Sequence, residues 1–340
     1  MTTENMNKRT IKKYHFIWPT LVLSILCGVF LMKGFSPNAM ASIELLQVAH
    51  YASVEEVTRL IRKGADVNAV RKDGWTPLLI AVMRNSNPAV LRVLIENGAD
   101  VNYVGNSGWT PLLLAIRNNS TPAVLRVLLE NGADVNFVGI DGRTTWTPLM
   151  VGVLHNSNPE ILRVLIENGA HINAAEEGGL TSLMIAIANN HNSNLDIIRF
   201  LIENGADVNA ISKDGFTPLM IAATRSPNPD ILRKLIDKKY ITAEEAVRAS
   251  SQSNPDVIRL LIENGAVVDT ADKNGVTTLM MAASISSNSE IVRVLIENGA
   301  DVSIKDMEGK NALNYAEEND KLKGSDAYSL LERMTFLNNK

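Results

Sequence analysis

The chain has 340 residues, 46% of them hydrophobic and 5% aromatic, and its single cysteine, Cys27, excludes an intramolecular disulfide framework. Residues 1–41 hold five of the 33 basic and one of the 37 acidic residues, so the remainder, with 28 basic and 36 acidic residues, has a net charge near −8. This balance excludes the clustered positive charge that nucleic-acid binding requires, and it argues against adhesion to an anionic membrane.

The first predicted element is an uncharged apolar segment, residues 16–32. Four basic residues precede it, and Lys33 follows it. A basic region, an apolar core and the motif Ala39-Met40-Ala41 are the three parts of an export signal, so cleavage is predicted before Ser42. The alternative is an uncleaved membrane anchor, since the length is at the low end for a span. Both interpretations place the rest of the chain outside the cytoplasm, with membrane contact only through residues 16–32 if they are retained.

After this segment, a helix-ending phrase of the type ENGADVN recurs along the whole chain. Its glycine falls at Gly64, Gly98, Gly132, Gly169, Gly205, Gly265 and Gly299. The usual spacing is 34 residues, and the single interval of 60 predicts one further, concealed unit. Such a period is typical of stacked supersecondary units that bury their apolar faces against their neighbours.

One period contains two helices and an extended finger. Thr76 can cap a helix whose first residue is Pro77, and the turn Asn85-Ser86-Asn87-Pro88 ends it. A second helix is predicted from about Pro88 to Asn97, where Gly98 supplies the left-handed conformation that terminates helices. The following residues, through the Gly105 to Gly108 region, are predicted to form a finger or hairpin.

This pattern resembles the ankyrin repeat, and the resemblance covers residues 42–340. It implies an all-α repeat solenoid, a stack of helix-turn-helix units with β-hairpin fingers. It further implies a protein partner bound on the concave face of inner helices and fingers, with no cofactor. The N-S-N-P turns and T-P-L-M starts are similar to those of bacterial ankyrin proteins.

One departure from the family pattern concerns the inner-helix start. The family's T-P-L-H ends here in leucine or methionine, at Leu79, Leu113, Met150, Met220 and Met280. The histidine hydrogen bonds between repeats are therefore absent, and we expect apolar packing to substitute for them.

The repeats can be placed as nine units. They are a capping repeat at 42–72, then 73–106, 107–143, 144–177, 178–213, 214–238, 239–273 and 274–307, and a polar cap from 308. The unit at 239–273 is predicted to lack its finger, because Ile241 runs directly into a capping box formed by Thr242 and Glu245. A longer finger is predicted near Arg143, and a longer inter-helix turn at His191-Asn192.

Charged residues recur on the predicted outer helices. Arginine precedes an acidic residue by four positions in seven units, at Arg92 and Glu96, Arg126 and Glu130, Arg163 and Glu167, Arg199 and Glu203, Arg233 and Asp237, Arg259 and Glu263, and Arg293 and Glu297. Such pairs share a helix face and contribute a few tenths of a kcal/mol each when exposed. We interpret them as a solvated ladder along the stack.

The sequence contains no recognisable catalytic or metal-binding constellation. After residue 41, the histidines His50, His155, His171 and His191 fall in separate repeats without metal-ligand spacing. His171 replaces the aspartate of the NGAD phrase and is predicted to be a turn residue. We therefore expect no enzymatic activity and no bound metal.

The candidate site is an aromatic row with a basic border. In ankyrin-like proteins, partners contact the residue before T-P-L, the finger tips and the inner helices, and the first of these positions holds Trp75, Trp109, Trp146, Leu180, Phe216 and Val276. The adjoining fingers carry Tyr103 and Phe137, and corresponding inner-helix positions carry Arg84, Arg117, His155 and Arg225. Tryptophan and arginine often dominate binding energy. Alternatively, each tryptophan packs on a neighbouring finger and stiffens the stack, and the two interpretations are compatible.

The sequence thus predicts a non-enzymatic scaffold that binds a protein partner outside the cytoplasm. The alternative is a structural or assembly factor tethered to the membrane by the apolar segment. The identity of the partner does not follow from the sequence, because repeat surfaces carry no partner motif.

Overall fold

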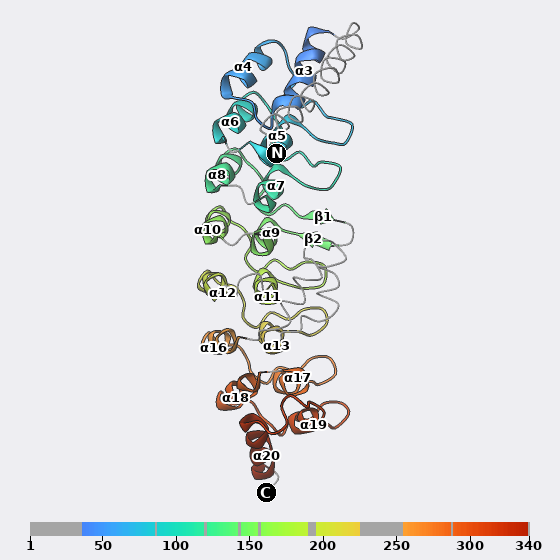
Figure 1. Ribbon diagram of the computed structural model, residues 1–340, viewed down its shortest axis with the longest axis vertical. Coiled ribbons are helices and arrows are strands. Elements are labelled where there is room, and N and C mark those ends of the chain that lie inside the picture. The colour runs from blue at the N-terminus through green and yellow to red at the C-terminus, as the bar shows by residue number, and fades with distance from the viewer. Residues whose placement is uncertain are drawn as a thin grey trace, which may run out of the picture. The chain divides into compact units, whose positions relative to one another are not determined.

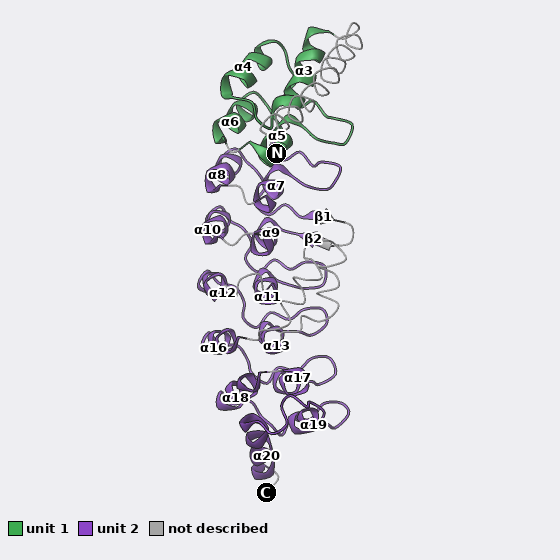
Figure 2. Ribbon diagram, in the orientation of Figure 1, with its two compact units in different colours: residues 1–100 green, residues 101–340 purple. Residues whose placement is uncertain are grey.

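A computed structural model of the chain describes residues 36–85, 87–118, 121–141, 144–155, 158–189, 195–224, 254–286 and 288–338. The chain divides into two compact units, residues 1–100 and 101–340, shown in different colours in Figure 2. In each unit, pairs of helices alternate with extended fingers (Figure 1).

The first unit contains two helix pairs. Helix α3 (Pro37–Val48) packs on α4 (Val54–Arg62), and α5 (Pro77–Arg84) packs on α6 (Pro88–Glu96). The pairs are stacked through contacts of α3 with α5 and of α4 with α6. Leucines from all four helices are fully buried between them, and these include Leu45, Leu60, Leu78, Leu79, Leu91 and Leu94.

The first repeat begins earlier than the sequence predicted. The Ser36 side chain caps α3 by accepting the Ala39 N–H at 3.3 Å. Ala41 is only 4% exposed, and the Ser42 hydroxyl oxygen accepts the Asp66 N–H at 2.8 Å. Residues 37–41, assigned above to the export segment, therefore belong to the first repeat, and the predicted cleavage point lies inside α3.

The apolar segment at 16–32 lies outside the described residues. Within the described ranges, no helix combines the length and the apolar character needed to cross a membrane.

The second unit contains two columns of stacked helices. The inner column is formed by α7 (Pro111–Arg117), α9 (Pro148–His155), α11 (Ser182–Ala188), α13 (Pro218–Thr224), α17 (Thr278–Ile285) and α19 (Ala312–Glu317). The outer column is formed by α8 (Pro122–Glu130), α10 (Pro159–Glu167), α12 (Leu195–Glu203), α16 (Pro255–Glu263) and α18 (Ser289–Glu297), with α20 (Asp326–Asn338) packed on α18 and α19. Strands β1 (Gly139–Asp141) and β2 (Thr144–Trp146) form an antiparallel hairpin, with Gly139 opposite Trp146. The predicted fold class, helix-turn-helix repeats with fingers, is confirmed.

Inner helices begin as the T-P-L pattern predicts. A threonine side chain caps six of them by accepting the N–H three residues on, at 3.2–3.4 Å, at Thr76, Thr110, Thr147, Thr181, Thr217 and Thr277, whereas Asn311 caps α19. The leucine or methionine that replaces the family's histidine is at most 2% exposed in Leu79, Leu113, Met150, Met220 and Met280. Apolar packing at these positions is confirmed.

Hydrogen bonds between repeats are nevertheless present, and one recurring set lies in the fingers. The Asn102 amide donates to the Gly132 carbonyl at 2.9 Å and accepts the Asp134 N–H at 2.8 Å. The same pair of bonds is made by Asn68, Asn136, Asn173 and Asn209. This asparagine ladder corrects the expectation that apolar packing alone replaces the missing histidine bonds.

The described helices of the interval of 60 residues form one helix pair, α13 and α16, where the sequence predicted two. Helix α16 packs on α13 as its outer helix and on α12, the outer helix of the preceding repeat. The Asn209 amide reaches the Gly265 carbonyl directly, at 2.9 Å. A repeat layer is about 8–10 Å thick, so none fits between these residues. The division into units 214–238 and 239–273 is therefore wrong for the described helices. The capping box at Thr242 and Glu245 lies outside the described residues.

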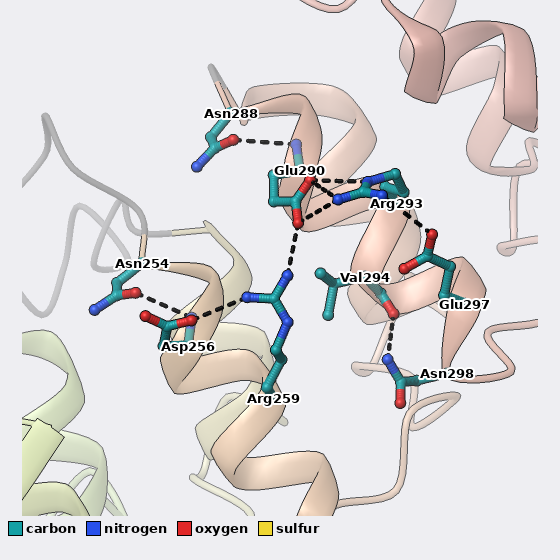
Figure 3. A network of polar contacts seen from close by, with 9 residues as sticks. All are labelled: Asn254, Asp256, Arg259, Asn288, Glu290, Arg293, Val294, Glu297 and Asn298. Atoms are coloured by element: carbon teal, nitrogen blue, oxygen red, sulfur yellow. Dashed lines mark hydrogen bonds and ion pairs between the residues drawn. The ribbon is translucent and has the colours of Figure 1, made fainter.

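The outer-helix charges pair both across repeats and within single helices. Glu160 accepts from Arg126 of the preceding repeat at 2.6 Å and lies 3.3 Å from Arg163 of its own helix. The same arrangement surrounds Glu290, which contacts Arg259 of the preceding helix and Arg293 of its own (Figure 3). Of the predicted pairs at four-residue spacing, Arg293 and Glu297 lie 3.4 Å apart. The ladder thus connects adjacent outer helices as well as residues within one helix.

Candidate functional site

The three tryptophans of the predicted row have different environments. Trp109 and Trp146, in the second unit, are only 6% and 5% exposed. Trp75, in the first unit, is half-buried. The prediction of three tryptophans on an exposed binding surface is therefore wrong for Trp109 and Trp146, whose rings pack within the stack. Trp75 remains available to a partner.

Arg117 covers one of the buried rings. Its guanidinium carbon lies 4.8 Å from the centre of the Trp109 ring, a cation–π distance. Arg117 follows Trp109 by eight residues, whereas Arg84 follows Trp75 by nine. Because each residue of a helix is rotated by about 100° from the one before it, the two arginines point in different directions from the helix axis. The two arginines are thus not equivalent, which corrects their assignment to corresponding positions. Met83 occupies the position in the first unit that Arg117 occupies in the second.

A hollow of about 290 Å³ opens beside Trp75, entirely within the first unit. It is lined by His50, Arg71, Trp75, Ile80, Met83 and Arg84. His50 follows the end of α3, Arg71 and Trp75 belong to the finger, and the other three residues belong to α5. The Thr76 cap and Pro77 fix the start of α5, and the Arg71 N–H donates to the Trp75 carbonyl at 2.9 Å. The finger and the inner helix are therefore held in a defined register around the hollow.

The two arginines of the hollow differ in whether an acidic side chain pairs with them. Arg71 forms two hydrogen bonds with Asp73, at 2.7 and 2.6 Å, and this contact lowers the pKa of the Asp73 carboxyl. Arg84 is exposed and makes no ion pair with any residue that the structure describes. The charge of Arg71 is therefore largely compensated by Asp73, whereas Arg84 has no acidic partner in the described part of the chain.

An aromatic pair lies at one edge of the hollow. The rings of His50 and Tyr51 meet edge to face, with their centres 4.5 Å apart. Tyr51 is 63% exposed. The lining residue His50 thus contacts an exposed aromatic side chain outside the hollow.

The remaining predicted site residues do not gather in this hollow. Tyr103, Phe137, His155 and Phe216 are half-buried and belong to the second unit. Arg225 lies outside the described residues, as does Arg143 of the longer finger.

Sequence reasoning missed several surface residues. His50, Arg71, Ile80 and Met83 line the hollow, but only the spatial meeting of helix and finger reveals this. In the second unit, the sixth residue after the repeat glycine is an exposed aliphatic in three fingers, at Val104, Val138 and Ile211. Because they share the same spacing from the repeat glycine, the sequence could have predicted a row of exposed apolar residues on the fingers.

The histidines do not assemble into a metal site in the described part of the chain, where no three potential metal-ligating side chains cluster. His171 is exposed, and its backbone N–H donates to Asn136 in the asparagine ladder, as suits a turn residue. His191 lies outside the described residues.

Comparison with known proteins identifies the repeats. The model for ankyrin repeats in three copies matches residues 45–139, 87–176, 149–245 and 246–332. A stretch of 50 residues, 15% of the chain, is 47% identical to the mitochondrial disaggregase of Bos taurus and 46% identical to that of Homo sapiens. The stretch spans only 7% of the length of each of these relatives. The helix pairs, the fingers and the family match together show that the chain belongs to the ankyrin repeat family.

Proposed function

We propose that the chain is a non-enzymatic protein-interaction scaffold that captures a partner through the hollow beside Trp75. Ankyrin repeats generally bind protein partners and are generally non-catalytic. The observation that carries the proposal is the half-exposed Trp75 ring next to an arginine, Arg84, that has no acidic partner among the described residues. Tryptophan and arginine at a partly enclosed site are the side chains that most often dominate interface energy.

Partner capture tests this proposal directly. The full-length chain is used as bait in extracts of its native host, and the captured protein is identified and then quantified for each variant. We expect Trp75→Ala to reduce capture by tenfold or more, the effect of a residue contributing about 1.4 kcal/mol or more. Arg84→Ala should weaken capture as well. The control is Arg62→Ala, which removes an exposed arginine from α4 instead.

The outcome is interpretable only if the variants stay folded. Thermal unfolding checks this, and Trp75 is suited to the test because its ring is already partly in solvent. If a folded double variant of Trp75 and Arg84 captures the same partner as the unmodified chain, the binding surface lies elsewhere and the proposal fails.

We further propose that the repeats lie outside the cytoplasm on a tether formed by an uncleaved apolar segment. The supporting observation is α3, which starts at Pro37 with Ser36 as its cap. A chain starting at Ser42 would lose this cap, the first turn of the helix and buried Ala41. The basic residues before position 16 favour an orientation with the N-terminus inside.

Sequencing the N-terminus of protein from the native host distinguishes tethering from secretion. We expect residues before Ser36 to be present, and we expect the protein to stay with the membrane fraction after alkaline extraction. A mature start at Ser42 would exclude the tether and support the exported form.

A further inference from the structure

We infer that the hollow beside Trp75 receives the C-terminal residue of the partner, an apolar side chain together with its free carboxylate. This inference rests on the proposed function and names the ligand chemistry of the same site. It draws on the size of the hollow, the apolar part of its wall, and the charge of Arg84, which has no acidic partner among the described residues.

The size limits the ligand to about one residue. Ligand pockets for drug-sized molecules begin at about 300 Å³, and this hollow measures about 290 Å³. A single leucine-sized or phenylalanine-sized side chain with its backbone fits such a volume. A folded surface or a helix would not enter it.

One part of the wall favours an apolar side chain. It is formed by Trp75 and Met83, which are half-buried, and by Ile80, which is buried. Aromatic and thioether groups provide polarisable, adaptable contact area for aliphatic and aromatic side chains. Enclosure of such a side chain would remove apolar surface of both molecules from water.

The rim favours an anion. Arg84 has no acidic partner within the described ranges, and His50 adds a ring with hydrogen-bonding nitrogens. Arg71 is held by Asp73 in a bidentate contact, so its position is fixed although its charge is offset. Arginine binds carboxylates through two parallel N–H donors, which gives both attraction and orientation.

A terminal residue combines both features within one small volume. In an extended peptide, successive side chains point to opposite sides, so an apolar residue and a neighbouring aspartate would not enter the same hollow. At a C-terminus, the carboxylate and the side chain are attached to the same Cα. The hollow therefore fits a chain end better than an internal acidic motif.

The test uses small probes and the full-length chain labelled with 5-fluorotryptophan. The probes are N-acetyl-L-leucine, its amide, and N-acetyl-L-leucyl-L-aspartic acid α-amide, whose only carboxylate is that of the side chain and which represents an internal acidic residue. The Trp75 fluorine signal is assigned from Trp75→Phe. We expect titration to shift this signal while the signals of buried Trp109 and Trp146 stay unchanged.

We expect millimolar binding of the free acid, as is typical for a ligand of this size, and roughly tenfold weaker binding of the amide. Arg84→Gln should bring the two affinities together, because it removes the charge that distinguishes them. Arg62→Gln should leave the preference intact. Equal binding of acid and amide, a preference that survives Arg84→Gln, or tighter binding of the aspartate probe would overturn the inference.

The two proposals fail in different ways. If Trp75→Ala abolishes partner capture but the probes show no preference for the free acid, the scaffold function stands and the terminal-residue ligand is wrong. If the probes behave as expected but Trp75→Ala leaves partner capture unchanged, the hollow binds carboxylates without serving the captured partner, and the scaffold proposal fails.

Discussion

Single asparagines at the ends of the ENGADVN phrases join one repeat to the next. Each uses its amide N–H and its carbonyl oxygen together, so the two fingers are fixed both in separation and in rotation. Aspartate, which lacks the donor, stands at the corresponding position in one repeat, where Asp269 accepts the Asp301 N–H at 3.0 Å. The side-chain amide is thus the group that allows both bonds to form.

The contribution of one ladder asparagine can be measured at Asn136. It donates to the Gly169 carbonyl at 2.9 Å and accepts the His171 N–H at 2.8 Å. We expect Asn136→Ala to lower the free energy of unfolding by about 1–3 kcal/mol, because both bonds are lost. Asn136→Asp, which keeps only the acceptor, should have a smaller effect. Urea denaturation gives both values, and an alanine variant as stable as the unmodified chain would contradict the prediction.

Acid sensitivity can be tested at Glu290, which lies between Arg259 and Arg293 (Figure 3). Hydrogen bonds and charge from these arginines lower the pKa of Glu290 from its ordinary value of 4.5. Because the folded-state pKa is below that of the unfolded chain, the stabilisation is present above about pH 4.5 and is lost as the pH falls through the folded value.

We therefore expect Glu290→Gln to lose less stability than the unmodified chain when the pH is lowered from about 6 to about 3. Thermal unfolding across this range measures the difference. Glu263→Gln is the control, since Glu263 makes no ion pair with a described residue. Identical pH profiles for the Glu290 variant and the unmodified chain would contradict the expectation.

The sequence predicted where the inner helices start, but it did not predict how far each tryptophan is exposed to solvent. Thr76 caps its helix because capping depends on local backbone geometry that a few neighbouring residues determine. The exposure of Trp75 and Trp109 depends on which side chain covers each ring. Arg117 lies over Trp109, but the equivalent residue of the first unit is Met83, and repeat spacing alone does not show this difference.

At the scale of helices, the sequence predicted nearly all of the described helices, but it assigned α13 and α16 to two different repeats. Dividing a 60-residue interval by the usual period assumes that every added residue builds a new layer. An insertion between the two helices of one repeat adds residues without adding a layer. Helices α13 and α16 pack as one pair although residues 225–253 separate them in sequence.

Replacement of residues 225–253 by Asn-Ser-Asn, the turn that precedes α6, tests this pairing. If α13 and α16 form one repeat, the variant should fold, and the Asn209 bond to Gly265 should persist. Adding Asn209→Ala should then cost about 1–3 kcal/mol in both the shortened and the unmodified chain. Hydrogen exchange at the Val267 N–H, which Asn209 accepts, reports the bond locally. Failure of the shortened chain to fold cooperatively would indicate an indispensable layer in the replaced segment.

At the scale of the whole molecule, each repeat of the second unit packs mainly on its immediate neighbours. Helix α18 contacts α16, α17 and α20, and helix α8 contacts α7 and α10. In such stacks, stability is approximately a sum of repeat and nearest-neighbour contributions, and local unfolding spreads over few repeats. The response to a core defect should therefore depend on its position along the stack.

Leu295 of α18 is completely buried, so Leu295→Ala should remove about 2–5 kcal/mol of stability through lost contacts and a residual cavity. We expect hydrogen exchange to accelerate in α16, α17, α18 and α20, because these helices share the damaged core, while α7 and α8 keep their protection. Leu125→Ala, at an equally buried position of α8, is the matched control and should produce the reverse distribution. If hydrogen exchange accelerates uniformly throughout residues 101–340 in either variant, the unit unfolds as one block. Coupling between neighbouring repeats would then be strong enough to prevent any repeat from opening alone.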